Sequence, residues 1–281
     1  MSYWSINGRS DVMLAVDDRA VQYGDGVFET IAIREGSPRF WDLHCDRLHL
    51  GCERLGILAP DVDVLSASLE DAIAASGVDA GFATAKIIVT AGRGERGYRR
   101  PAAQSPTTII GVYAATPRPG KDYRDGIAIG ICQTRLGLQP QLAGIKSLNR
   151  LEQVLGRNEI DEQVVQEGLM LDIEGRLICG TMSNVFLLID NTFVTPAITR
   201  CGVSGIMRRK LLETLDARGV GFDVRDVDVG ELADARGVLL SNSQFGVLPV
   251  RKCAGREWRI RDEIRAVMAA VRKAGVAECP P

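Results

Sequence analysis

The sequence carries almost no net charge, because its 34 basic and 36 acidic side chains leave a formal charge of −2 at pH 7. A chain without an overall positive field has no general means of holding nucleic acid or an anionic membrane surface. This balance excludes both as properties of the whole surface. Local clusters of arginine therefore have to be judged separately.

Long apolar runs are also missing. The longest, residues 185–189 and 237–240, are far shorter than the ~20 residues that a helix needs to cross a bilayer. The N-terminus lacks the basic segment followed by an apolar one that is typical of secretory signals. We therefore expect a cytoplasmic protein.

Motifs for metal and nucleotide chemistry are absent as well. The seven cysteines are scattered without C-x-x-C spacing, which predicts small buried residues and neither a disulfide framework nor a zinc site. The two histidines, His44 and His49, do not share a helix face, so we expect both to be structural and no metal to be bound. The three-glycine nucleotide fingerprint is missing, and Gly24-Asp25-Gly26 is interpreted as a turn.

Length and composition indicate a globular protein with a sizeable core. With 281 residues, of which 46% are apolar and 25% charged, the chain can form two modest α/β units or one large one. Residues 117–122 have the proline and glycine content of a linker. We therefore predict a smaller α+β domain over residues 1–116 and a larger α/β domain over residues 123–281.

Hydrophobic periodicity and turn residues predict the elements of each domain. In the first domain these are a strand over 23–33, a helix that Asp42 caps and Gly56 ends, a helix over 65–75, and strands over 85–90 and 107–114. In the second domain they are strands over 127–133, 169–172, 176–178, 185–189, 192–195, 222–227 and 238–241, and helices over 148–166, 206–218 and 261–273.

Lysine is scarce, because only six of the 34 basic side chains are lysines. Lys146 lies directly before the predicted helix over 148–166, whose apolar side chains are expected to pack inward: Leu148, Leu151, Val154 and Leu155. A lysine at the rim of a core loses part of its hydration, which lowers its pKa and provides a neutral amine for Schiff-base chemistry. The alternative is a snorkelling lysine at a helix start.

Three segments resemble one group of enzymes: residues 142–155 (LAGIKSLNRLEQVL), 18–30 (DRAVQYGDGVFET) and 202–208 (GVSGIMR). The first closely resembles the catalytic segment of the aminodeoxychorismate lyases. These lyases belong to the fold type IV pyridoxal phosphate enzymes, together with D-amino acid and branched-chain transaminases. The resemblance extends over nearly the whole chain. It implies a two-domain fold, pyridoxal 5'-phosphate as cofactor, a homodimer, and Lys146 as the residue that forms the Schiff base and later moves the proton.

A cofactor phosphate needs backbone N–H groups at a helix start and at least one fixed cation. The sequence itself permits the first at Ile206 and Met207, with Ser204 as N-cap and Gly205 allowing a close approach. The alternative there is a plain helix cap. The resemblance adds Arg47 as the cation, a residue that would otherwise be a solvated helix arginine.

Further cofactor contacts come from the resemblance alone. Ser243 and Gln244 match a loop that gives hydroxyl and amide donors to the phosphate, although such clusters are usually turns. Cys179 stands where the group has a glutamate against the ring nitrogen, and a thiol with a reference pKa of ~8.5 is a poorer anionic partner. We hypothesise that aromatisation of the product makes a weaker electron sink tolerable. The alternative is a small buried residue without ring contact.

Four arginines crowd the glycine-bearing loop over residues 90–100. Nucleic-acid binding is a weak interpretation of this loop, because the chain is nearly neutral and the loop has a single aromatic residue. The lyase substrate carries two carboxylates, which suit bidentate guanidinium contacts. The resemblance assigns Arg96 and Tyr98 to substrate binding.

The activity that the resemblance implies is that of a lyase which converts 4-amino-4-deoxychorismate to 4-aminobenzoate and pyruvate on the route to folate. Two alternatives stay open. One is a D-amino acid or branched-chain transaminase on the same scaffold, which differs in the fate of the leaving group. The other is a non-catalytic binding protein that has lost its cofactor, an interpretation that Cys179 favours.

Overall fold

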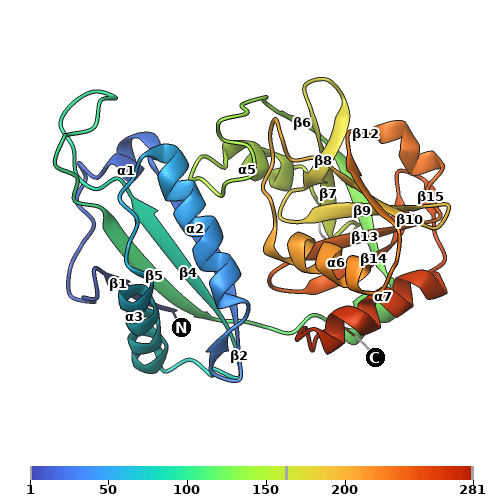
Figure 1. The fold of residues 1–281 in the computed structure, drawn as a ribbon, viewed down its shortest axis with the longest axis horizontal. Coiled ribbons are helices and arrows are strands. Elements are labelled where there is room, and N and C mark those ends of the chain that lie inside the picture. Colours follow the sequence, from blue (N-terminus) through green and yellow to red (C-terminus); the bar gives the residue numbers. More distant parts are fainter. Residues whose placement is uncertain (1, 162–163, 280–281) are drawn as a thin grey trace. The chain divides into compact units, whose positions relative to one another are not determined.

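The computed structural model describes residues 2–161 and 164–279. The chain divides into two compact units (Figure 1), which are Met1–Thr116 with Ile145–Asn149, and Pro117–Gly144 with Arg150–Pro281. The sequence-based division left Ile145–Asn149 in the second domain, whereas backbone hydrogen bonds join this segment to the first unit. In the described ranges, no helix has both the length and the apolar character to cross a bilayer.

An antiparallel sheet forms the first unit, with the strand order β1-β5-β4-β2-β3. Its strands are β1 (Ser2–Ile6), β2 (Gly26–Arg34), β3 (Ser37–Pro38), β4 (Phe82–Thr90) and β5 (Thr107–Ala114). Its helices are α1 (Arg19–Tyr23), α2 (Trp41–Leu55) and α3 (Val62–Ser76). Side chains of α2 and α3 share one hydrophobic core with β2, β4 and β5, so both helices cover the same face of the sheet (Figure 1).

Helix α2 ends where the sequence predicts. Gly56 takes the left-handed conformation at its C-cap, with φ of 67°, and Leu48 and Cys52 are buried on its inner face. Its start differs from the prediction. Phe40 occupies the N-cap, and Asp42 is the second residue of the helix, where a carboxylate still interacts favourably with the helix dipole.

A ten-stranded mixed sheet forms the second unit, in the order β11-β10-β9-β13-β14-β6-β7-β8-β12, with β15 paired to β14. The strands are β6 (Ile127–Leu136), β7 (Glu167–Asp172), β8 (Arg176–Gly180), β9 (Asn184–Ile189), β10 (Thr192–Pro196), β11 (Phe222–Arg225), β12 (Val227–Asp228), β13 (Gly237–Asn242), β14 (Gly246–Cys253) and β15 (Arg256–Glu257). The helices are α4 (Gly120–Asp125), α5 (Leu151–Asn158), α6 (Ile206–Ala217), the 3-10 helix η1 (Val229–Ala233) and α7 (Asp262–Lys273).

The helices of this unit cover different parts of the sheet. Helices α6 and α7 contact each other, α6 packs on β13, and α7 packs on β14 (Figure 1). Helix α5 packs on β6 and β7. All seven cysteines of the chain are buried, as the sequence predicts for small hydrophobic residues.

The helix after the lysine is shorter than predicted, and its packing was predicted wrongly. It spans Leu151–Asn158 instead of 148–166, and residues 162–163 lie outside the described part of the chain. The side chains that were expected to pack inward are largely exposed: Leu151, Val154 and Leu155. Gly156 is the buried residue, because a Cβ atom there would lie 3.1 Å from Met170, so the helix approaches the sheet on its glycine side.

Several strands also differ from the prediction. Strands β3, β14 and β15 were not predicted, and Pro249 within β14 is unusual for a central strand. The structure accommodates it, since Pro249 lies opposite Leu239 of β13, and the pairing of β14 with β6 begins only at Val250. The strand predicted over 222–227 is two strands, because its first part pairs with β10 and its last part with β8.

Candidate active site

Lys146 lies in a short segment that extends the sheet of the first unit. The Phe28 N–H donates to the Lys146 carbonyl and the Leu148 N–H donates to the Gly26 carbonyl, both at 2.9 Å, which adds Ile145–Asn149 antiparallel to the edge of β2. The predicted position directly before a helix is therefore wrong. The lysine backbone is held by sheet hydrogen bonds, which fix it more firmly than a helix end would.

The amine of Lys146 lies over an aromatic ring. Its Nζ is 4.3 Å from the centroid of the Phe28 ring, and the Nζ of Lys86 is 5.1 Å from the same centroid. A cation above a ring face is stabilised by the ring quadrupole. The half-buried amine is thus held between the sheet edge and an aromatic surface instead of extending freely into solvent.

Glu29, the next residue of β2, points to the opposite face of the sheet and is buried beside α2. Arg47 donates to it from Nε at 2.8 Å and from Nη2 at 2.5 Å, and His44 Nδ1 lies 2.6 Å from its Oε2. All three side chains are at most 9% exposed. Arg47, one of the predicted phosphate ligands, is therefore fixed by a bidentate ion pair and is not a solvated helix arginine.

The pKa values of Glu29 and His44 depend on the balance between burial, which disfavours the charged form, and pairing with neighbouring groups. Burial alone would raise the pKa of Glu29, but the charge and hydrogen bonds of Arg47, followed by those of His44, lower it to about 2. Burial lowers the pKa of His44 despite the neighbouring carboxylate. At pH 7 His44 is thus neutral, its Nδ1–H donates to Glu29, and its buried Nε2 has no hydrogen-bond partner among the described residues.

The N-cap residue of helix α6 in the second unit is Gly205, contrary to the expectation that it is Ser204. Gly205 has φ −69° and ψ 142°, and as a glycine it makes no side-chain cap hydrogen bond. A Cβ atom at position 205 would lie 2.1 Å from Oδ1 of Asn184, so only glycine fits. The N–H groups of the buried Ile206 and Met207 therefore form a ready anion site.

A tight turn follows β13 at the predicted phosphate loop. Oδ1 of Asn242 accepts hydrogen bonds from the N–H groups of Gln244 and Phe245, both at 2.9 Å, which fixes Ser243 and Gln244 in the turn. Asn242 also donates to the Met182 carbonyl at 3.3 Å. Asn242 was not predicted as a site residue, although an Asn two residues before a turn is a typical signal for this arrangement.

The start of β9 brings these segments of the second unit together. Asn184 is its first residue, pairs with Ser241 of β13, contacts Gly205 and donates to the Val203 carbonyl at 2.9 Å. The structure therefore places the start of α6, which carries Ile206 and Met207, beside the strand ends that carry the turn over 242–245. This clustering fits a phosphate group, since the first N–H groups of a helix and a turn with hydroxyl and amide side chains lie near one strand end.

Cys179 lies at the end of β8, opposite Met170 of β7, and is 6% exposed. It packs in a small cluster of buried residues that is rich in sulfur and includes Cys132 and Cys201. Burial, with a smaller contribution from the charge of Glu167, raises its pKa far above that of an ordinary thiol. Cys179 is therefore a neutral thiol at pH 7.

Glu167 is a buried carboxylate whose charge acts on this thiol, and it was not predicted as a site residue. Its Oε1 accepts hydrogen bonds from the N–H of Gly168 and from the N–H and hydroxyl of Thr181, at 2.9, 3.1 and 2.5 Å. Its Oε2 accepts the Ser183 hydroxyl at 2.9 Å. Both oxygens are occupied in fixing the turn between β8 and β9, so Glu167 does not replace the glutamate that the resemblance expects at position 179.

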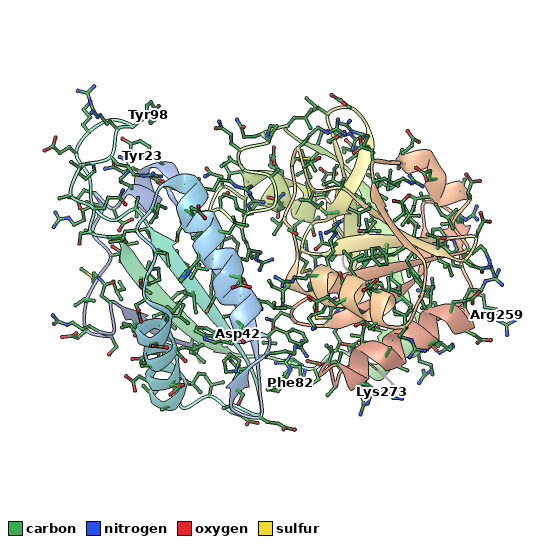
Figure 2. All side chains as sticks on the ribbon, in the orientation of Figure 1. Tyr23, Asp42, Phe82, Tyr98, Arg259 and Lys273 are labelled. Carbon is green, nitrogen blue, oxygen red and sulfur yellow. The ribbon has the colours of Figure 1, made fainter. Side chains whose placement is uncertain are left out.

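The predicted substrate-binding residues lie on an exposed loop of the first unit. Arg96 is exposed and makes no hydrogen bond or ion pair within the described residues. Tyr98 is 86% exposed, and its ring centroid is 5.3 Å from that of Tyr23. Both side chains are labelled in Figure 2. Tyr98 also lines a cavity of about 650 Å³, of which Arg96 is not part.

Two arginines that the sequence did not single out anchor this loop. Arg19 donates to Asp25 at 2.7 Å and to the Tyr98 carbonyl at 2.8 Å, and Arg100 makes a bidentate ion pair with the same carboxylate. Burial would raise the pKa of Asp25, but the hydrogen bonds of Arg100 and Arg19 lower it. The loop is therefore fixed at its base, and the exposed Arg96 and Tyr98 are carried by a rigid support.

Comparison with known proteins defines the family. The sequence profile of the amino-transferase class IV family matches residues 26–253, so the chain belongs to this family. Membership confirms the predicted fold type IV architecture and pyridoxal 5'-phosphate as the cofactor.

Individual relatives fall into two groups by name. An aminodeoxychorismate lyase of Vibrio harveyi is 35% identical over 263 residues, which cover 92% of this chain and 93% of that protein. The crystal structure of 4-amino-4-deoxychorismate lyase from Pseudomonas aeruginosa superposes with a TM-score of 0.89 at 43% identity and covers 96% of this chain and 98% of that one. A D-alanine aminotransferase of Bacillus licheniformis is 27% identical, with 88% of this chain and 86% of that protein covered.

The charge balance around Glu29 predicts a specific response to acid. Because its pKa is about 2 in the folded state and about 4.5 in the unfolded chain, its ionisation stabilises the fold by about 3 kcal/mol above pH 4.5, and this contribution is lost as the pH falls towards 2. Glu29→Gln should therefore lower the free energy of unfolding at pH 7 by about 3–5 kcal/mol, since Arg47 loses its partner.

Urea unfolding at pH 7 and at pH 3.5 measures both effects. The difference between wild type and Glu29→Gln should shrink at the lower pH, whereas Glu53→Gln, which changes an exposed glutamate of α2, should match wild type at both. A difference that stays constant from pH 7 to pH 3.5 would show that Glu29 does not carry the charge assigned to it.

Proposed function

We propose that this protein is a 4-amino-4-deoxychorismate lyase, which eliminates pyruvate from its substrate to give 4-aminobenzoate for folate synthesis. The observation that carries the proposal is the segment around Lys146. It resembles the catalytic segment of the lyases, and in this fold it is fixed along the edge of β2. The similarity to lyases of Vibrio harveyi and Pseudomonas aeruginosa over nearly the full length supports the same activity.

The cofactor is held, in this proposal, by residues that the fold already fixes. The N–H groups of Ile206 and Met207, with the turn residues Ser243 and Gln244, bind the phosphate, and Arg47 supplies a cation. Support comes from the start of α6, where the N-cap is a glycine without a side chain, and from the turn over residues 242–245. When bound, the cofactor supplies an electron sink for the charge that remains after a proton leaves the substrate.

Lys146 has two tasks in this reaction. With the cofactor bound, its Nζ would hold the cofactor aldehyde in the resting enzyme, and the neutral amine would remove the proton from the amine-bearing ring carbon of the substrate. Loss of enolpyruvate would make the ring aromatic, and protonation of the enolpyruvate would give pyruvate. The backbone of Lys146, fixed by sheet hydrogen bonds, would hold the amine in one place for both tasks.

Cys179 faces the cofactor ring nitrogen in this proposal. A neutral thiol does not keep that nitrogen protonated as a carboxylate would, so the electron sink is weaker. The aromatisation of the product compensates, because it supplies driving force that a transaminase reaction lacks. The buried position of Cys179 and its neutral state at pH 7 are consistent with this role.

The protein acts, in our proposal, as a cytoplasmic homodimer. Assembly is supported by the apolar side chains that α5 leaves exposed, since large exposed apolar groups are typical of interfaces between chains. These are Leu151, Val154 and Leu155. Their exposure is also the reason why the predicted inward packing of α5 is wrong.

Lys146→Ala tests the central claim. Borohydride reduction of the wild-type holoenzyme should abolish its visible absorption band, and peptide mapping should find the adduct on Lys146. The variant should show neither, and its formation of 4-aminobenzoate should fall by about 10³-fold or more. Lys121→Ala, an exposed lysine, is the control and should behave as wild type.

The same enzyme preparation separates the lyase from a transaminase. Fluorescence of 4-aminobenzoate from aminodeoxychorismate is followed beside pyruvate formation from D-alanine with a keto-acid acceptor. Rapid transamination without 4-aminobenzoate would contradict the proposal, as would an adduct on a residue other than Lys146.

Arg96→Ala is expected to weaken substrate binding. Loss of a guanidinium contact to a carboxylate should raise KM by about 10–100-fold, because charged hydrogen bonds of this kind contribute about 1.5–3 kcal/mol. Steady-state kinetics on aminodeoxychorismate measure the effect, with Arg99→Ala on the same exposed loop as the matched control. An unchanged KM and kcat in Arg96→Ala would remove this residue from the site.

Cys179→Glu tests the account of the electron sink. Because aromatisation drives the reaction, a carboxylate at this position should change lyase turnover by no more than about an order of magnitude, or about 1.4 kcal/mol in the barrier. Single-turnover kinetics of the variant and of Cys179→Ala measure it. A gain of several orders of magnitude would mean that the thiol is a genuine handicap.

A further inference from the structure

Arg208 is a buried arginine in the first turn of α6. It is 8% exposed, and its hydrogen bonds run to neutral oxygens of β10. Its Nε donates to the Thr195 hydroxyl at 3.4 Å and its Nη2 donates to the Pro196 carbonyl at 3.1 Å. The Thr195 hydroxyl in turn donates to the Val185 carbonyl at 2.8 Å, so it accepts from Arg208 without carrying charge.

No carboxylate neutralises this guanidinium within residues 2–161 and 164–279. Burial lowers the pKa of Arg208, and no neighbouring charge of either sign contributes. Two other arginines with little exposed side chain differ, since Arg19 pairs with Asp25 and Arg47 pairs with Glu29. A buried cation without an anion is costly, because its lost hydration is not replaced.

Arg208 lies in the first turn of α6, three residues after the N-cap Gly205. Side chains of an α-helix tilt towards its N-terminus, and the Cβ of Arg208 lies 3.6 Å from the position that a Cβ would take at Gly205. The helix dipole and the guanidinium therefore add positive potential at one place. The third guanidinium nitrogen, Nη1, has no hydrogen-bond partner in the described chain, and it is not among the fully enclosed polar atoms.

We propose that Arg208 supplies the buried positive charge that the phosphate dianion of the cofactor neutralises at the start of α6. The inference rests on the proposed function, because it takes the phosphate to bind there. In this proposal the phosphate is bound by the amides of Ile206 and Met207, by Arg47, and also by the charge of Arg208 in the first turn of α6. In the absence of the anion, the same charge destabilises the fold.

Arg208→Gln is the variant that separates charge from packing. Glutamine can still donate to the oxygens of Thr195 and Pro196, but it carries no charge. Trp fluorescence of the apoprotein gives dissociation constants for pyridoxal 5'-phosphate, for pyridoxal without phosphate, and for inorganic phosphate. We expect the variant to bind pyridoxal phosphate and inorganic phosphate about tenfold more weakly, and to bind pyridoxal as wild type does.

Thermal unfolding provides a second test, because the variant that binds phosphate more weakly should not be less stable than wild type as an apoprotein. The melting temperature of apo Arg208→Gln should equal or exceed that of apo wild type, and the rise that phosphate causes in wild type should be largely lost. Arg209→Gln removes the next arginine, which is exposed and paired with Glu213 at 3.0 Å, and it should leave both constants unchanged. Arg208→Lys retains the charge and should keep phosphate affinity within about threefold of wild type.

Three outcomes would overturn the inference. The first is that apo Arg208→Gln melts at a lower temperature than apo wild type while phosphate still raises its melting temperature. The second is that Arg208→Gln loses as much affinity for pyridoxal as for pyridoxal phosphate. The third is that Arg208→Lys loses more than tenfold in phosphate affinity. If Arg208→Gln does not fold, the phosphate affinity of Arg208→Lys alone tests the inference. Failure of wild type to bind pyridoxal phosphate would instead contradict the proposed function, so the two failures are distinguishable.

Discussion

The pairing of Ile145–Asn149 with β2 is the constraint on which the chemistry depends. Two backbone hydrogen bonds, at Phe28 and at Gly26, place the lysine segment along a strand whose other side is fully paired with β4. An amine that must be displaced and then return to the same carbon needs a fixed origin. A strand provides this better than a loop, because its backbone positions are shared with the whole sheet.

Buried charge is handled in three different ways around this framework. Glu29 is neutralised by Arg47, Glu167 accepts N–H and O–H hydrogen bonds and lies 3.9 Å from Arg157, and Arg208 has two hydrogen bonds to neutral oxygens but no carboxylate partner among the described residues. The first two arrangements are complete without a ligand. The third becomes complete only with an anion, and for that reason it points to a ligand while the others point to rigidity.

Sequence patterns predicted most strands and helices of both units, because these elements depend on local signals. Such signals are the alternation of apolar and polar residues in strands and the glycines that end helices, such as Gly56. They predicted neither the partner of Lys146 nor the exposed Leu151, since periodicity defines an apolar face without saying what covers it. Resemblance named Arg47 and Met207 as site residues. It could not supply Glu29, whose role depends on strand alternation and on a helix that arrives from elsewhere in the fold.

The scarcity of lysine acquires a physical meaning in this site. A guanidinium stays protonated at neutral pH and binds phosphate without attacking an aldehyde. Every neutral lysine amine, in contrast, can react with the aldehyde in place of Lys146. Arginine therefore supplies positive charge near a reactive aldehyde at no chemical cost. Of the remaining lysines, Lys210 and Lys252 are paired with glutamates and lie in the second unit on helix α6 and strand β14. Selectivity for one amine thus follows from composition as well as from geometry.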